Sequence, residues 1–286
     1  EIADRDWSSD VCSSDLGAHN LPKPLKPFFV VPTTSGTGSE VTMVAVVADS
    51  DKGVKLPFTS YFLMPNAAVL DSRMTLTLPP HITAMTGMDA LTHAVEAYTC
   101  LGANPMSDAY ATAAIRKISQ NLMKVMEDPK SADGRLELAQ ASTMAGVAFS
   151  NSMVGLVHAL GHSLGAVCHI PHGLCMSIFL PYVLEYNQEI NGERIGELLL
   201  YLAGEDIYAA TPKAQRATKA IAHIRAMRDE LYQRCKLPRT LTETGKVRED
   251  QLRQVAELTV NDGAIIFNPK EASVEDALAV LKRAWI

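Results

Sequence analysis

The spacing of apolar residues changes near residue 80. Before it, apolar residues form short runs at 28–31, 43–47 and 67–70, whose length and β-branched content predict buried strands. After it, apolar residues recur at helical spacing to the C-terminus, beginning with the stripe Met88, Leu91, Val95 and Tyr98. The pattern predicts an α/β segment over residues 17–79 and an all-helical domain over residues 80–286.

The helical pattern is interrupted at several points that predict helix boundaries. The segment 236–241 contains Pro238 and predicts a loop, and Ser273 is a candidate N-cap with Asp276 three residues further on. After the first helix, we expect helices at 107–126, 135–149, 152–166, 173–187, 192–203, 212–236, 249–260 and 273–284.

Residues 1–16 differ in character from the rest of the chain. They are rich in Ser and Asp and follow neither the helical nor the strand period. The stretch RDWSSDVCSSDL within them also resembles translated adapter-like sequence found at the ends of metagenome-derived reading frames. We therefore expect this segment to be disordered or not native to the protein.

Composition narrows the class of protein. The 286 residues, 47% hydrophobic, are enough for one or two domains with a large core. A net charge of −6 argues against binding to nucleic acid, because a phosphate-backbone binder carries a basic face. Five cysteines without a CxxC pair, no secretory segment and no long apolar run lead us to expect a cytoplasmic protein with reduced thiols and no membrane partner.

Four polar residues stand out in the helical part as candidate metal ligands. Asp89 and His93 are four residues apart, so both project from one face of a helix, and Glu96 lies on that same face. His158 and His162 repeat this four-residue spacing on a helix made largely of Leu, Val, Ala and Gly, and His172 stands where the next helix should begin. Taken singly, each of these residues is explained at least as well by a surface Asp–His pair or a core histidine as by a metal-ligand role. Together, three imidazoles and a carboxylate form a full ligand set for a transition metal.

The hydroxyl-rich loop 33–40, with sequence TTSGTGSE, lies between the first two expected strands. Such a loop can turn backbone N–H groups toward a phosphate or a cofactor amide. By itself the signal is weak, since a plain Gly/Ser turn accounts for it about as well.

These blocks resemble the iron-containing (group III) alcohol dehydrogenase family. The resemblance runs from about Pro27 to Trp285 and rests on PTTSGTGSEVT, TGMDALTHAVEAY, GLVHALGHSLGA and PHG. It implies the remainder of a Rossmann-like nucleotide-binding domain over residues 17–79, followed by an all-α metal-binding domain. The same architecture occurs in dehydroquinate synthase.

The resemblance also implies an activity and a set of site residues. Asp89, His93, His158 and His172 match the metal ligands, His162 matches a histidine beside the nicotinamide and substrate, and Thr33, Thr34, Thr37 and Lys55 match residues near the cofactor. The implied cofactors are Fe(II), with Zn(II) as an alternative, and NAD or NADP. The implied substrate is a small alcohol or aldehyde, and the implied assembly is a homodimer or a larger homo-oligomer.

Two departures from the family pattern affect these expectations. Family members carry a longer N-terminal part with a GGGS-type turn that cradles the pyrophosphate, and this sequence has no such turn. We therefore expect an N-terminally truncated chain that binds a metal but binds NAD(H) or NADP(H) poorly. The second departure, Ser72 in place of the usual proline after Asp71, is minor.

Other functions remain open at this stage. The chain could be a lyase of the same architecture, like dehydroquinate synthase, or a metal-binding fragment without turnover. A metal-dependent hydrolase is less consistent with the sequence, because no HExxH motif is present.

Overall fold

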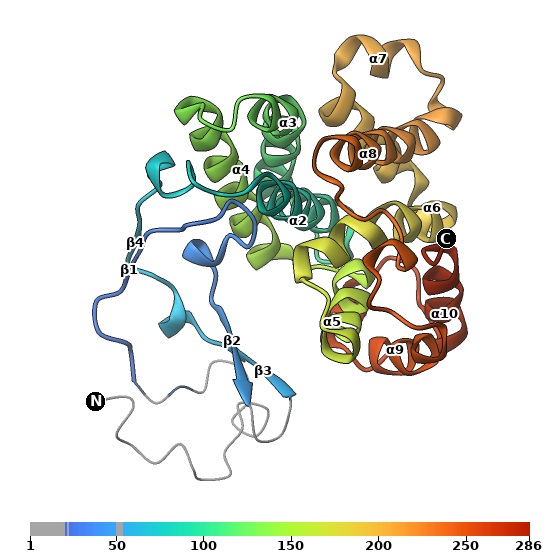
Figure 1. Ribbon diagram of the computed structural model, residues 1–286, viewed down its shortest axis with the longest axis horizontal. Helices are drawn as coiled ribbons and strands as arrows, with labels where there is room; N and C mark the ends of the chain where they lie inside the picture. Colours follow the sequence, from blue (N-terminus) through green and yellow to red (C-terminus); the bar gives the residue numbers. More distant parts are fainter. Residues whose placement is uncertain (1–20, 22, 50–53) are drawn as a thin grey trace.

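The computed structural model describes residue 21 and the ranges 23–49 and 54–286; the side chains of residues 46–57 lie outside this description. The expectation for residues 1–16 therefore falls outside the described chain. Within it, a small α/β part leads into a helical domain (Figure 1). The predicted order of strands followed by helices is confirmed.

The α/β part consists of two two-stranded sheets. Strand β1 (Phe29–Val30) pairs in parallel with β4 (Ala67–Ala68), and β2 (Val44–Asp49) pairs antiparallel with β3 (Val54–Thr59). The three predicted strands are found at their expected places. The sequence pattern missed β3, because it contains Pro57, which lacks a backbone N–H and usually argues against an interior strand.

The expectation that these strands are buried is wrong for the first of them. Phe29 is 65% exposed and the adjoining Val31 is 46% exposed. A parallel strand is buried only where other elements cover both faces of its sheet. Within the described residues, β1 has β4 as its only hydrogen-bonded neighbour, so its apolar side chains remain accessible.

Helix α2 (Pro80–Thr99) lies at the centre of the helical domain, between the α3–α4 pair and the α5–α6 pair (Figure 1). Its side chains are buried on every face from Gly87 to Thr99. A helix that is buried all round places its polar residues inside the protein as well as its apolar ones. The polar residues of α2 therefore need partners on the surrounding helices.

The remaining helices confirm the pattern with three differences. Met153, at φ 78°, ends α4, so the helix expected at 152–166 begins only at Leu156. The helices expected at 173–187 and 192–203 are joined in α6, which has a non-helical residue, Asn191, near the expected break. The short helix α7 was not expected. The bounds are α3 (Pro105–Glu127), α4 (Ala132–Ser152), α5 (Leu156–Cys168), α6 (His172–Ala203), α7 (Glu205–Ala210), α8 (Lys213–Cys235), α9 (Leu252–Thr259) and α10 (Val274–Arg283).

Among the described residues, no single helix has the length and apolar character needed to cross a membrane. Helices α4 and α5 meet those criteria only when taken together, and they are bent by 104° at their junction.

A contact between two glycines joins the threonine loop, residues 33–40, to the helical domain. Gly38 has φ 61°, and a Cβ placed on it would lie 2.6 Å from the Cα of Gly146 on α4. Neither backbone can move aside as a flexible side chain would. The pair therefore holds the loop against α4 at a distance that only glycine permits.

We expect Gly38→Ala to destabilise the protein for two reasons. The left-handed backbone costs alanine about 1–2 kcal/mol, and the overlap with Gly146 costs about 1–3 kcal/mol more. Urea unfolding followed by circular dichroism measures the resulting decrease in the free energy of unfolding. Gly245→Ala is the matched control, because Gly245 has φ 66° and nothing within 4 Å of its added Cβ. Equal losses in the two variants would show that the contact with α4 contributes nothing.

Candidate metal centre

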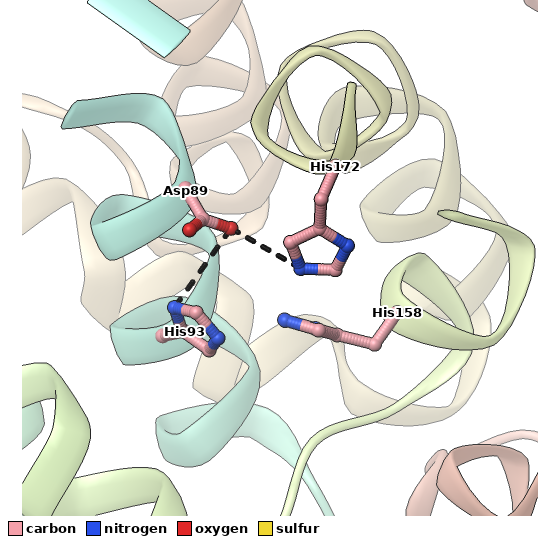
Figure 2. Close-up of side chains that lie close together, drawn as sticks. All are labelled: Asp89, His93, His158 and His172. Atoms are coloured by element: carbon pink, nitrogen blue, oxygen red, sulfur yellow. Dashed lines mark ion pairs between the residues drawn. The ribbon is translucent and has the colours of Figure 1, made fainter. Parts of the chain in front are cut away.

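The four residues singled out as candidate ligands meet at one point in the structure. Each offers one ligand atom, and these atoms all lie within 4.8 Å of one another. Asp89 and His93 extend from α2, His158 extends from α5, and His172 is the first residue of α6 (Figure 2). The predicted convergence of the four side chains is therefore present.

Close packing at the start of α6 brings His172 to this point. A Cβ on Gly173 would lie 2.6 Å from the backbone oxygen of Met85, so the absence of a side chain lets α6 touch α2. As a result, His172 Nε2 lies 3.4 Å from Asp89 Oδ1. Gly173 of the PHG block is therefore needed for packing, because only a residue without a side chain lets α6 approach α2 this closely.

Three of the four candidate ligands are buried, and each of these three has a ligand atom without a hydrogen-bond partner. Asp89 is 2% exposed, His93 is 6% exposed and His158 is 3% exposed. Asp89 Oδ1, His93 Nδ1 and His158 Nε2 make no hydrogen bond. Buried polar atoms are normally paired, and three unpaired acceptor-capable atoms around one point fit a bound cation. The residues present therefore suit a divalent metal.

Electrostatics favour the protonation states that a metal requires in the imidazoles. Burial lowers the pKa of His93 well below its ordinary value, and the nearby His158 and His172 lower it further. Burial likewise lowers the pKa of His158. Both rings are therefore neutral near pH 7, as metal ligands must be. Burial raises the pKa of Asp89 to about 7, a shift that a cation would reverse.

Glu96 lies behind His158 and contacts it directly. Its Oε2 is hydrogen-bonded to His158 Nδ1, and its Oε1 accepts a hydrogen bond of 2.7 Å from the backbone N–H of Val157. Burial raises the pKa of Glu96 to about 7, while the backbone N–H groups of Val157, Gly155 and His158 act in the opposite direction. The sequence placed Glu96 on the ligand face of its helix but gave it no role.

His162 lies beside the metal centre on the next turn of α5. Its side chain is 46% exposed, and its ring stacks on that of His172 with centroids 5.4 Å apart. Its Nδ1 lies 2.9 Å from Asp262 Oδ2. Burial opposes ionisation of Asp262, but its hydrogen bond to His162 and its electrostatic interaction with that residue leave the pKa of Asp262 lowered. Asp262 was not predicted from the sequence, because it is 100 residues from His162 along the chain, and it also caps the short 3-10 helix Gly263–Phe267.

The threonine loop borders the same centre. A hydrogen bond with the backbone of Gly36 acts on the pKa of His93 against the effect of burial, so the loop reaches this ligand. Thr33 and Thr37 are exposed and Thr34 is half-buried. Lys55 is part of β3, but its side chain lies outside the described residues.

Comparison with known protein families gives two matches along the chain. The model for the C-terminal part of the Fe-containing alcohol dehydrogenase family matches residues 83–285. A second model, iron-containing alcohol dehydrogenase, matches residues 5–72. The chain belongs to the iron-containing alcohol dehydrogenase family.

Relatives in this family are similar to the chain over most of its length. It is 34% identical to the NAD-dependent methanol dehydrogenase of Bacillus methanolicus and 36% identical to the 1,3-propanediol dehydrogenase of Klebsiella pneumoniae, over 94% of this chain and 68% of each relative. The crystal structure of a 1,3-propanediol oxidoreductase superposes with a TM-score of 0.88 at 35% identity, over 94% of this chain and 69% of that one. The predicted fold class, part of an α/β domain followed by an all-α domain of the iron-type alcohol dehydrogenases, is confirmed.

Proposed function

We propose that this member of the alcohol dehydrogenase family catalyses reversible hydride transfer between a small primary or secondary alcohol and NAD or NADP, using a bound divalent metal. The observation that carries the proposal is the buried set Asp89, His93 and His158, whose ligand atoms lack hydrogen bonds and face a common point with His172. Family membership supports the oxidoreductase class, and the methanol and propanediol dehydrogenases among the relatives support a small alcohol substrate.

Asp89, His93, His158 and His172 would hold the metal. Three imidazoles and one carboxylate suit Fe(II) and Zn(II) alike. When bound, the metal supplies a Lewis acid for the alcohol oxygen, and the nicotinamide cofactor accepts the hydride. Asp89, His93 and His158 are buried, and electrostatic interactions with their ligand atoms are stronger there than in water.

His162 is the proposed catalytic residue. Because the Asp262 carboxylate accepts a hydrogen bond, His162 Nδ1 is the donor and its Nε2 is the basic atom. Its partial exposure allows that nitrogen to exchange a proton between substrate and solvent. Thr33, Thr34 and Thr37 are proposed to contact the cofactor, since the threonine loop borders the candidate metal centre. The same role is proposed for Lys55 on the family match over residues 5–72 alone.

Metal analysis and an activity assay on the same protein test the proposal. After anaerobic purification and incubation with Fe(II) or Zn(II), we expect about one metal per chain by plasma mass spectrometry. We also expect reduction of NAD or NADP with methanol, butanol or 1,3-propanediol, provided that the nucleotide is supplied at a concentration high enough for the weak binding expected from the sequence. Calorimetry with each nucleotide measures cofactor binding separately.

Two outcomes would replace this proposal. Stoichiometric metal together with tight nucleotide binding but no turnover on any alcohol would favour a lyase or a catalytically inactive metal-binding protein. Failure to take up either metal would show that the four residues do not form a metal site.

A further inference from the structure

The carboxylate of Glu96 contacts two parts of the helix that carries His158. Glu96 is 4% exposed and lies on α2, the helix of Asp89 and His93. One carboxylate oxygen accepts the backbone N–H of Val157 at 2.7 Å, and the other pairs with the imidazole Nδ1 of His158. A single buried side chain of α2 therefore holds both the backbone and the ligand side chain of α5.

The contact with the imidazole selects one tautomer of His158. Of the two partners, the carboxylate is the acceptor, so Nδ1 carries the hydrogen. Nε2 is then left with its lone pair, and Nε2 is the atom that is buried without a hydrogen bond and lies among the other ligands. The hydrogen bond thus prepares the nitrogen that a metal would need.

The contact with the backbone completes the start of α5. The first residues of a helix have N–H groups without partners inside the helix, and the N-cap residue here, Gly155, has no side chain to satisfy them. Glu96 accepts a hydrogen bond from the N–H of Val157, and Asn268 Oδ1 accepts one of 3.3 Å from the N–H of Leu156. A Cβ on Gly155 would lie 3.1 Å from Glu96 Oε1, so glycine leaves room for the carboxylate.

We propose that Glu96 is a positioning residue of the metal centre, which fixes the tautomer of His158 and docks the start of α5 onto α2. The inference rests on the proposed metal site. Hydrogen-bond partners of metal-ligating histidines typically contribute about 10–100-fold to metal affinity. We expect a contribution of that size from Glu96.

Glu96→Gln tests the role with almost no change in shape. If the new amide oxygen accepts the N–H of Val157, its NH₂ group faces His158 and forces the tautomer with hydrogen on Nε2. If the amide is turned round, its NH₂ group opposes the N–H of Val157 and the start of α5 loses its acceptor. Either arrangement weakens metal binding, whereas the shorter carboxylate of Glu96→Asp keeps an acceptor and should restore part of the affinity.

The measurement is titration of the metal-free full chain with Co(II), followed by its visible absorption, for wild type and variants. We expect the Kd of Glu96→Gln to rise about 10–100-fold, with a changed spectrum at saturation. Glu197→Gln is the matched control: Glu197 also bonds to α2, accepting from the Tyr98 hydroxyl at 2.6 Å, and is not among the ligand residues. Equal Kd values for wild type and Glu96→Gln would overturn the inference while leaving the metal site intact. No binding by wild type would overturn the metal site and the inference together.

Nitrogen NMR of the wild type gives a second test that does not depend on folding of a variant. In ¹⁵N-histidine-labelled protein, two-bond correlations identify which ring nitrogen carries hydrogen. We expect His158, assigned by the signals lost in His158→Asn, to carry it on Nδ1 both without metal and with Zn(II). Hydrogen on Nε2 in the wild type would overturn the proposed role of Glu96.

Discussion

Asp89→Asn is expected to lose the metal and yet to make the metal-free protein more stable. Asp89 supplies the only carboxylate among the four candidate ligands. Metal sites with four ligands bind with roughly 10–16 kcal/mol, so one ligand corresponds to about 3 kcal/mol, or on the order of 100-fold in affinity. Turnover with alcohol should fall with the metal content.

The effect on stability has the opposite sign and depends on pH. The pKa of Asp89 is raised from 3.8 to about 7 in the folded protein. The folded state therefore binds more protons than the unfolded state between these values, and its stability falls as pH rises through that window. The penalty is complete above pH 7 and amounts to up to about 4 kcal/mol. Asparagine does not titrate, so the Asp89→Asn variant does not lose this stability as pH rises.

Chemical denaturation of metal-free wild type and variant at pH 5 and pH 8 measures this effect. We expect the advantage of Asp89→Asn to be much larger at pH 8 than at pH 5. A chelator is present throughout, so that metal binding does not contribute. An advantage that is the same at both values would contradict the burial of an ionisable carboxylate at this position.

His162→Ala is expected to lower kcat without releasing the metal. If His162 exchanges the substrate proton, its removal should cost about 10²–10⁴ in rate. Its ring stacks on His172 but its ligand atoms are not part of the converging set, so the metal content should stay close to that of wild type. Steady-state oxidation of alcohol, together with metal analysis of the same samples, measures both quantities.

His81→Ala provides the control, because His81 is exposed in the first turn of α2. Asp262→Asn should lower kcat in the same direction as His162→Ala: if the amide oxygen accepts the Ala264 N–H, its NH₂ group faces His162 Nδ1 and favours the tautomer with hydrogen on Nε2. Loss of metal in parallel with activity in His162→Ala would instead assign this residue to the metal centre and not to proton exchange.

The four candidate ligands could be picked out from the sequence because of their spacing along helices. Asp89 and His93 share a helix face by their separation alone, and His158 and His172 stand out against apolar helices. Their convergence depends on how α2, α5 and α6 pack, which close contacts such as that at Gly173 decide. The resemblance to the family predicted that the four residues converge, which their spacing along the chain could not.

Other parts of the site depend on contacts that no local pattern encodes. Asp262 meets His162 across a separation of 100 residues, and Glu96 meets His158 across 62. The spacing puts Glu96 on the ligand face of its helix but does not show which side chain it meets, and nothing in the sequence around Asp262 distinguishes it from a solvated acid. The exposure of β1 was missed for a related reason: apolar content predicts a strand, but burial depends on which elements cover its sheet.

The contact between Gly38 and Gly146 also limits how the two parts of the molecule can move. Two backbones in direct contact resist being pressed closer, and beside them the Glu40 carboxylate accepts a hydrogen bond of 2.6 Å from the Thr143 hydroxyl of α4. The backbone contact therefore opposes compression of the loop onto α4, while the hydrogen bond opposes its separation from α4. Because Gly36 of the same loop reaches His93, a shift of α4 that carried the loop with it would also act on this candidate ligand.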